Sequence, residues 1–291
     1  MVTAALVKEL REKTGAGMMD CKKVLTETDG DLEKASELLR ERGIAKAAKK
    51  SGRVAAEGLV EAYVTEDGKV GAIVEVNAET DFVAKNEEFQ GLVKTILETI
   101  IKSEAKTLED ALKLETSEGT LEELIVSKTA TIGEKLSLRR FAKITKNDNE
   151  TFGEYIHMGG KIAVLIVTEN TDESVAKDVA MHAAAMRPKY VKIEEVPEEE
   201  VQREKEVLTE QAMNEGKPKD IAEKMVIGRL NKFYKEICLE EQPFVKDDKS
   251  SVKQFVKNNG GTIKAMYRYE VGEGMEKKEE HSAEEVAKQM K

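Results

Sequence analysis

Cysteine, aromatic residues and long apolar runs are scarce in this chain. Its two cysteines, Cys21 and Cys238, lie far apart in apolar helical patterns, so the sequence has neither a disulfide framework nor the ligand spacing of a zinc site. No apolar run approaches the length of a membrane span, and residues 1–10 lack the apolar stretch of a signal peptide. We therefore expect two buried thiols in a cytoplasmic protein without a membrane partner.

An excess of positive charge is also absent. The formal net charge is −10, which argues against a general nucleic-acid binder, because such binding depends on neutralising phosphates. Charged residues make up 36% and hydrophobic residues 40% of the sequence, a balance typical of a soluble, helix-rich globular protein. The basic segment 46–53 is more simply a solvated hinge than an RNA contact. We expect no direct nucleic-acid partner.

Motifs for catalysis or metal binding are missing as well. Residues 159–161, Gly-Gly-Lys, lack the spacing and the magnesium ligand of a phosphate-binding loop. The histidines His157, His182 and His281 are too widely spaced for a metal site, and His182 lies in a helical pattern that predicts burial. We interpret the chain as a binding protein that is not an enzyme and holds no metal or cofactor of its own.

The first half of the chain combines helical and strand patterns. Three short helical patterns come first, and Gly43 is placed as the left-handed stop of the third. Two β-branched runs then flank residues 67–68, Asp-Gly, a strong hairpin signal. A helix is predicted from Asn86 to Lys102, and another starts at Thr120, where Glu123 completes a capping box.

The second half predicts another hairpin system, which begins near Ser137 and leads to a helix over 172–186. Two long helical patterns follow and predict a hairpin of helices, broken at residues 216–218. A returning strand over 262–271 and a capping box at Ser282 complete the chain. The facing stripe of the second long helix is expected to contain Ile221, Met225, Leu230 and Phe233.

Together these patterns predict an α+β fold with a two-lobed core of antiparallel sheets and helices. In chain order the expected parts are a three-helix domain (1–45), a linker (46–57), a core N-lobe (58–136), a core C-lobe (137–190 and 239–274), an inserted helical hairpin (191–238) and a C-terminal helical module (275–291).

Phe82 stands out within the polar segment 77–86, which joins a predicted strand to a predicted helix. Only 4% of the chain is aromatic, so a phenylalanine in such a connection either fills its own core or inserts into a partner. The neighbours Asp81, Lys85 and Asn86 are polar and favour the partner, but the core alternative has equal weight.

Met18 and Met19 pose the same question. Adjacent residues face different directions on a helix, so both cannot be buried in a module of three short helices. At least one is expected on the surface, where methionine suits adaptable contacts. The alternative is that Met19 lies in the core and Met18 is merely tolerated.

Several segments, in this order along the chain, resemble the bacterial elongation factor Ts family. The similarity extends over essentially the whole chain, and several of its motifs are long. The segments are residues 10–23 (LREKTGAGMMDCKK), 80–86 (TDFVAKN), 181–184 (MHAA), 216–218 (GKP), 242–245 (QPFV) and 270–274 (EVGEG).

This resemblance implies guanine-nucleotide exchange on the translational GTPase elongation factor Tu. The factor would need no cofactor and would act on the magnesium and GDP bound by its partner. The resemblance also implies that the first domain is similar to a ubiquitin-associated (UBA) domain and that the chain ends in a C-terminal helix. Among the implied partner-binding residues, Asp81 and Phe82, flanked by Thr80 and Val83, would meet the GTPase near its nucleotide site, with Phe82 in an apolar pocket.

The remaining implied contacts lie elsewhere in the chain. Met18 and Met19 would contact a helix of the same GTPase domain, and His157 would lie on the lobe that faces the partner's C-terminal barrel. The alternative function is a helical scaffold or chaperone adaptor that binds protein partners through the N-terminal module. The helical hairpin is expected either to pair with a second copy of the chain or to fold onto its own core.

Overall fold

The structure is a computed structural model that describes residues 2–275 of the 291-residue chain. The chain divides into two compact units. Of the described residues, unit 1 contains 2–61, 74–141 and 270–275, and unit 2 contains 62–73 and 142–269. This division differs from the predicted lobes, because strands β1 (Glu57–Val64) and β2 (Val70–Ala78) each contribute to both units.

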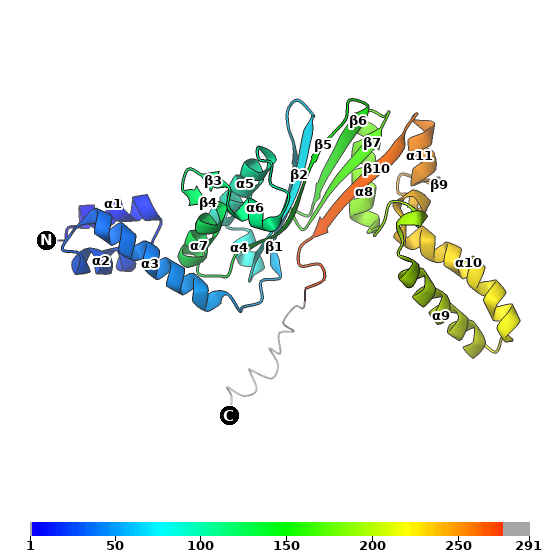
Figure 1. Cartoon of the computed structure of the whole chain (residues 1–291), viewed down its shortest axis with the longest axis horizontal. Coiled ribbons are helices and arrows are strands. Elements are labelled where there is room, and N and C mark those ends of the chain that lie inside the picture. The colour runs from blue at the N-terminus through cyan, green and yellow to red at the C-terminus, as the bar shows by residue number, and fades with distance from the viewer. Residues whose placement is uncertain (1, 276–291) are drawn as a thin grey trace. The chain divides into compact units, whose positions relative to one another are not determined.

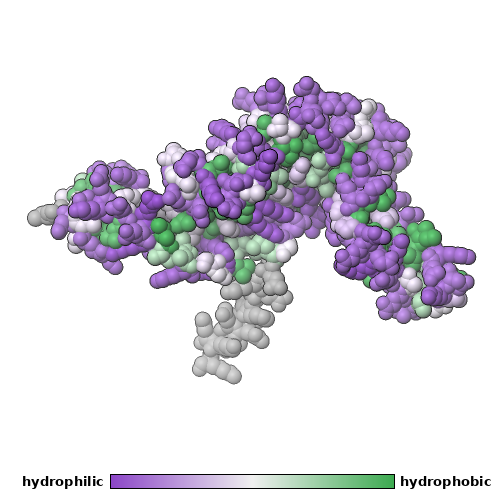
Figure 2. Space-filling view, in the orientation of Figure 1, coloured by the Kyte–Doolittle hydropathy of each residue, from purple (hydrophilic) through white to green (hydrophobic). Residues whose placement is uncertain are grey.

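Unit 1 begins with the three predicted helices, α1 (Ala4–Thr14), α2 (Met18–Glu27) and α3 (Leu32–Lys50) (Figure 1). Polar side chains cover most of their visible surface (Figure 2). Helices this short depend on packing against one another for stability. That packing is supplied by a shared core of Val7, Leu10, Cys21, Val24, Leu25 and Ala35.

The prediction that Gly43 ends the third helix is wrong. Helix α3 continues through Gly43 to Lys50, within the segment predicted as a linker. A Cβ atom at Gly43 would lie 3.3 Å from the Cβ of Ala130 on helix α7 (Leu121–Ile132). The glycine therefore allows two helices to approach closely, and it does not terminate one.

The next sheet has the order β1-β2-β5, where β5 is Ser137–Thr145, and each of its strands contributes residues to both units. The hairpin predicted at residues 67–68 joins β1 to β2, and the N–H of Thr65 donates to the carbonyl of Val70. Between β2 and β5 along the chain come the remaining helices of unit 1 and a two-stranded ribbon: α4 (Asp81–Ala84), α5 (Glu87–Ile101), α6 (Leu108–Leu112), β3 (Glu115–Thr116), β4 (Gly119–Thr120) and α7.

Strand β5 corrects the predicted hairpin system. It was expected to pair with the strands that follow it, but it lies beside β2. Strand β2 is buried along nearly its whole length, so its polar backbone needs a partner strand on both sides. Strand β5 also supplies Arg139 and Arg140, which contact the fully buried carboxylate of Glu75 on β2 at 3.1 and 2.7 Å.

Unit 2 is built on a sheet in the order β10-β7-β6. Its strands are β6 (Glu150–His157), β7 (Ile162–Glu169) and β10 (Thr262–Glu270). Strands β6 and β7 are antiparallel, with His157 opposite Ile162. The predicted helix α8 (Glu173–Met186) packs closely on β6. The α+β class expected from the sequence is confirmed.

Helices α9 (Glu198–Asn214) and α10 (Lys219–Ile237) form the predicted hairpin. The chain reverses at Gly216, whose φ of 82° lies in the left-handed region that favours glycine. The prediction that Ile221 faces α9 is wrong, because its side chain is exposed and the next residue, Ala222, is buried. The buried residues of the hairpin are Leu208, Ala212, Ala222 and Val226, and the two alanines allow close packing of the helices.

Short elements that the sequence did not predict surround the base of the hairpin. They are η1 (Ile193–Glu195), η2 (Leu239–Glu241), β8 (Pro243–Phe244), β9 (Asp247–Ser251) and α11 (Val252–Asn258). Among residues 2–275, no helix combines the length and apolar character that crossing a bilayer requires. The predicted helix at Ser282 and the module that contains it lie, apart from Met275, outside the described residues.

Candidate functional site

The connection between β2 and α5 forms a short helical turn. Thr80 caps α4, because its hydroxyl oxygen accepts a hydrogen bond from the N–H of Val83 at 3.4 Å. At the other end of α4, Ala84 is buried. Asn86 then caps α5 by accepting a hydrogen bond from the N–H of Glu88 at 2.7 Å. Both ends of the turn are therefore attached firmly to unit 1.

Phe82 projects from this turn into solvent. Its side chain is 80% exposed, the highest value among the large apolar side chains that are described. The alternative that Phe82 fills its own core is wrong, because the fully buried Phe89 on α5 has that role. Burying a phenylalanine side chain stabilises a protein or complex by about 1.5–3 kcal/mol. Burial of this exposed ring by a partner would contribute a binding free energy of that size.

Asp81 lies beside Phe82 at the start of α4. Its carboxylate pairs with the ammonium group of Lys85 at 3.4 Å, and both side chains are substantially exposed. Exposed pairs at this spacing add little to stability. The carboxylate thus remains accessible to a partner next to the aromatic ring.

Met18 and Met19 occupy the first turn of α2. Their side chains are 57% and 76% exposed, whereas Cys21 and Leu25 on the same helix are buried. The alternative that Met19 lies in the core is therefore wrong. Two adjacent flexible thioether side chains form an apolar surface that can adapt to another protein.

His157 lies at the end of β6 in unit 2. Its Nδ1 atom is 3.1 Å from the hydroxyl oxygen of Tyr155. The next residue, Met158, has a φ of 51° and a side chain that is 72% exposed. Residues 159–160 continue the tight turn, and the N–H of Lys161 returns to the carbonyl of His157. This end of β6 therefore also presents side chains for contact.

The expected contact residues thus form separate groups. The structure brings Thr80, Asp81, Phe82 and Val83 together on one turn. Met18 and Met19 lie on α2 of the same unit, and His157 belongs to unit 2.

Glu134 also contacts the turn, through its carboxylate. No sequence pattern indicated this residue, because it is 54 positions away from Thr80.

The titratable groups buried elsewhere are occupied with structural contacts. Nε2 of the fully buried His182 lies 2.9 Å from Oε1 of Gln242, and its Nδ1 accepts a hydrogen bond from the N–H of Val245. Burial lowers the pKa of His182. Both thiols are buried as predicted, and burial raises the pKa of Cys238 to about 11.

Within residues 2–275 no three histidine, cysteine or carboxylate side chains are grouped as metal ligands would be. The described residues offer surfaces for contact: a fixed exposed ring beside a carboxylate, and two exposed methionines.

Comparison with models of protein families identifies the family of this chain. The model of the family described as Elongation factor TS matches residues 79–273, which is more than half of the chain. The chain belongs to the elongation factor Ts family. The match begins one residue before Thr80, so it includes the turn that carries Phe82, and it also contains His157. Helix α2, which carries Met18 and Met19, lies before the matched range of this elongation factor Ts family member.

Proposed function

We propose that this protein is the guanine-nucleotide exchange factor of the translational GTPase elongation factor Tu. It promotes GDP release by disturbing the magnesium and phosphate site of that partner. Membership of the elongation factor Ts family supports the class of function. The single observation that carries the mechanism is the ring of Phe82, 80% exposed on a turn whose two ends are fixed.

Exchange of this kind requires no covalent chemistry from the factor, so the protein needs no catalytic residue or cofactor. A GTPase holds GDP through phosphate contacts and a magnesium ion. A factor that binds the nucleotide-free GTPase more tightly than the GDP-bound form must weaken GDP binding by the same ratio. The factor therefore has to favour a GTPase conformation in which the magnesium and phosphate ligands are displaced.

The turn supplies the displacing group in this proposal. Phe82 enters an apolar pocket of the GTPase near its nucleotide site and shifts the packed elements there. Asp81 orients the ring through hydrogen bonds or a charge pair, and Thr80 and Val83 complete the contact surface. Because both ends of the turn are fixed, little ordering entropy is lost when the ring is buried.

Other surfaces provide binding strength in this proposal. Met18 and Met19, on a three-helix module similar to a UBA domain, contact a helix of the same GTPase domain. His157 and the end of β6 contact the C-terminal barrel of the GTPase. These contacts hold the complex together, while Phe82 changes the partner's conformation.

The decisive experiment is the Phe82→Ala substitution. Release of a fluorescent GDP analogue from elongation factor Tu is followed by stopped flow, and circular dichroism monitors the fold. We expect much slower release with an unchanged fold, because truncating a buried interface aromatic costs about 2–4 kcal/mol. Leu108→Ala is the matched control, since it truncates another exposed apolar side chain in unit 1. Release as fast as that of the natural protein would remove Phe82 from the mechanism.

The helical hairpin is the proposed site of self-association. Figure 2 shows apolar side chains gathered on it within a polar surface. The exposed apolar residues of these helices are Val207, Met213, Ile221 and Ile227. Sedimentation of the free protein and of its complex with the GTPase tests this proposal. A single monomeric species at all concentrations would contradict it.

A further inference from the structure

The turn that carries Phe82 is joined to a loop distant in the sequence by reciprocal hydrogen bonds, in which a carboxylate on each side accepts from the backbone of the other. One carboxylate oxygen of Glu134 accepts hydrogen bonds from the N–H groups of Glu79 and Thr80 at 3.1 and 3.0 Å. Its other oxygen accepts the hydroxyl proton of Thr80 at 2.7 Å. In return, the carboxylate of Glu79 accepts a hydrogen bond from the N–H of Lys135 at 2.7 Å. Hydrogen bonds to ionised groups are the stronger ones in proteins.

The loop that carries Glu134 is itself held in place. It follows Gly133, which ends α7 in the left-handed conformation with a φ of 89°. Leu136 is buried, and its N–H donates to the hydroxyl oxygen of the buried Thr129 on α7 at 3.3 Å. Glu134 therefore connects the turn to a firm support.

A positive charge offsets the proximity of these carboxylates. The guanidinium group of Arg53 lies 3.3 Å from the carboxylate of Glu79. The ammonium group of Lys135 donates to the carbonyl of Arg53 at 3.0 Å. The segment after α3, the turn and the loop before β5 are thus held in one network.

Thr80 transmits this restraint to the exposed ring. Its hydroxyl group donates to Glu134 and also accepts from the N–H of Val83, in the single helical turn that contains Phe82. Without Glu134, the N–H groups of Glu79 and Thr80 would lose their acceptor, and the turn could adopt other conformations. A side chain that displaces groups in a partner must be held in a fixed orientation by the residues that support it.

We propose that Glu134 is a positioning residue, which holds the turn so that Phe82 enters the GTPase in one orientation. This role rests on the proposed exchange function and goes beyond it by naming the support of the ring. In this role Glu134 acts on exchange through its contacts with the turn that carries Phe82.

The test compares Glu134→Ala and Glu134→Gln in the exchange assay with elongation factor Tu. Three charge-assisted contacts are lost in the alanine variant, so we expect release of the GDP analogue to slow about tenfold. Glutamine can accept from both N–H groups and donate to the Thr80 hydroxyl oxygen, so Glu134→Gln should recover most of the rate. Asp110→Ala is the matched control, because it removes another carboxylate that accepts a backbone hydrogen bond, at the start of α6. It should leave release unchanged.

A double-mutant cycle separates positioning from a general loss of stability. If Glu134 acts through the ring, Glu134→Ala should not slow release further in a Phe82→Ala background. Hydrogen exchange of the free protein should also show faster exchange of the Glu79 and Thr80 amides in Glu134→Ala. If that variant does not fold, Thr80→Val carries the same comparison; it removes the hydroxyl bond to Glu134 together with the cap on the N–H of Val83 and leaves both backbone bonds to Glu134 in place.

Each result has a distinct meaning. Normal release by Phe82→Ala overturns the proposed mechanism of exchange itself. Slow release by Phe82→Ala together with normal release by Glu134→Ala overturns only the positioning role. Equal slowing by Glu134→Ala with and without the ring also overturns it, as does a Glu134→Gln variant that is no faster than Glu134→Ala.

Discussion

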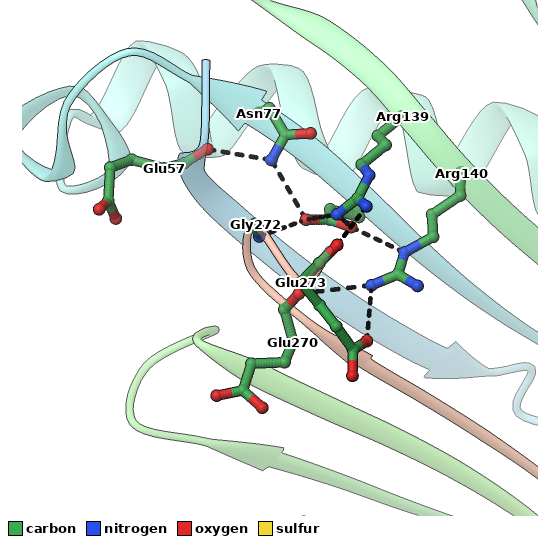
Figure 3. Close-up of polar contacts among 8 residues, drawn as sticks. Glu57, Asn77, Arg139, Arg140, Glu270, Gly272 and Glu273 are labelled. Atoms are coloured by element: carbon green, nitrogen blue, oxygen red, sulfur yellow. Dashed lines mark hydrogen bonds and ion pairs between the residues drawn. The ribbon is translucent and has the colours of Figure 1, made fainter. Parts of the chain in front are cut away.

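The fully buried carboxylate of Glu75 accepts a hydrogen bond from the backbone N–H of Gly272 at 2.8 Å, across 197 positions of the sequence. The same carboxylate also contacts the guanidinium groups of Arg139 and Arg140 and the side-chain amide of Asn77 (Figure 3). Buried carboxylates are tolerated when they are paired and hydrogen-bonded. Glu75 therefore attaches the segment that follows β10 to β2 and β5.

We expect Glu75→Ala to lower the free energy of unfolding by about 2–4 kcal/mol. Removing one partner of a buried ion pair typically costs about 3–5 kcal/mol, but the two arginine side chains are about a quarter exposed and regain some solvation. Chemical denaturation measures the change. The control is Glu109→Ala, which removes an exposed pair with Lys113 and should have no measurable effect. Equal stability of the two variants would contradict a structural role for Glu75.

Acid should destabilise the protein through His182. Burial lowers the pKa of His182 in the folded state, whereas the unfolded chain titrates near about 6.5. Below that pH the unfolded state binds more protons than the folded state, so the free energy of unfolding falls until the pH reaches the folded pKa. Denaturation series between pH 7 and 5 measure the slope. A His182→Leu variant should be less stable at neutral pH but lack this part of the slope, and an identical slope would contradict the assignment.

Replacement of both Met18 and Met19 by alanine should weaken binding more than it slows maximal release. We expect a loss of about 1–2 kcal/mol, or about five- to thirtyfold in Kd, because these side chains provide contact area in the proposed complex. Titration calorimetry with the GTPase gives the affinity, and release at saturating factor gives the maximal rate. Leu108→Ala again serves as the control. A loss of maximal release as large as that of Phe82→Ala would contradict the division between binding and displacement.

Two glycines should respond in opposite ways to alanine. A Cβ at Gly153 on β6 would lie 2.2 Å from the carbonyl of Ala176 on α8, whereas a Cβ at Gly91 in α5 would meet nothing within 4 Å. We expect Gly153→Ala to destabilise the protein by about 1–3 kcal/mol through overpacking. Gly91→Ala should stabilise it by about 0.5–1 kcal/mol through helix propensity. Thermal unfolding measures both, and a stable Gly153→Ala variant would refute the close approach of α8 to β6.

Local patterns in the sequence were sufficient to predict many helices and their starts. The Thr120–Glu123 capping box is present at the start of α7, and Asn86 caps α5. These features depend on residues within three or four positions of one another, so a short window of sequence contains all the interacting groups. The end of α3 was mispredicted because Gly43 packs against Ala130, which is distant in the sequence, and does not end the helix.

The candidate site, too, could be predicted only in part from the sequence. The residues of the turn could be named from the sequence, but whether Phe82 was core or surface could not, because its polar neighbours suited both outcomes. The exposure of the ring follows from the burial of Phe89 in its place. The support from Glu134 could not be foreseen, since a glutamate before a strand has no pattern that indicates which backbone amides it will meet.

The sequence by itself thus determined the α+β composition, most helix positions and the location of the turn that carries Phe82. It could do so because propensity, capping and periodicity act between near neighbours. Only the tertiary structure decided the position of β5 beside β2, the exposure of Phe82 and the carboxylate contacts of Glu75 and Glu134. The contacts of Glu134 with Thr80 and of Glu75 with Gly272 join groups more than 50 positions apart, and such partners are selected by the packing of the whole unit.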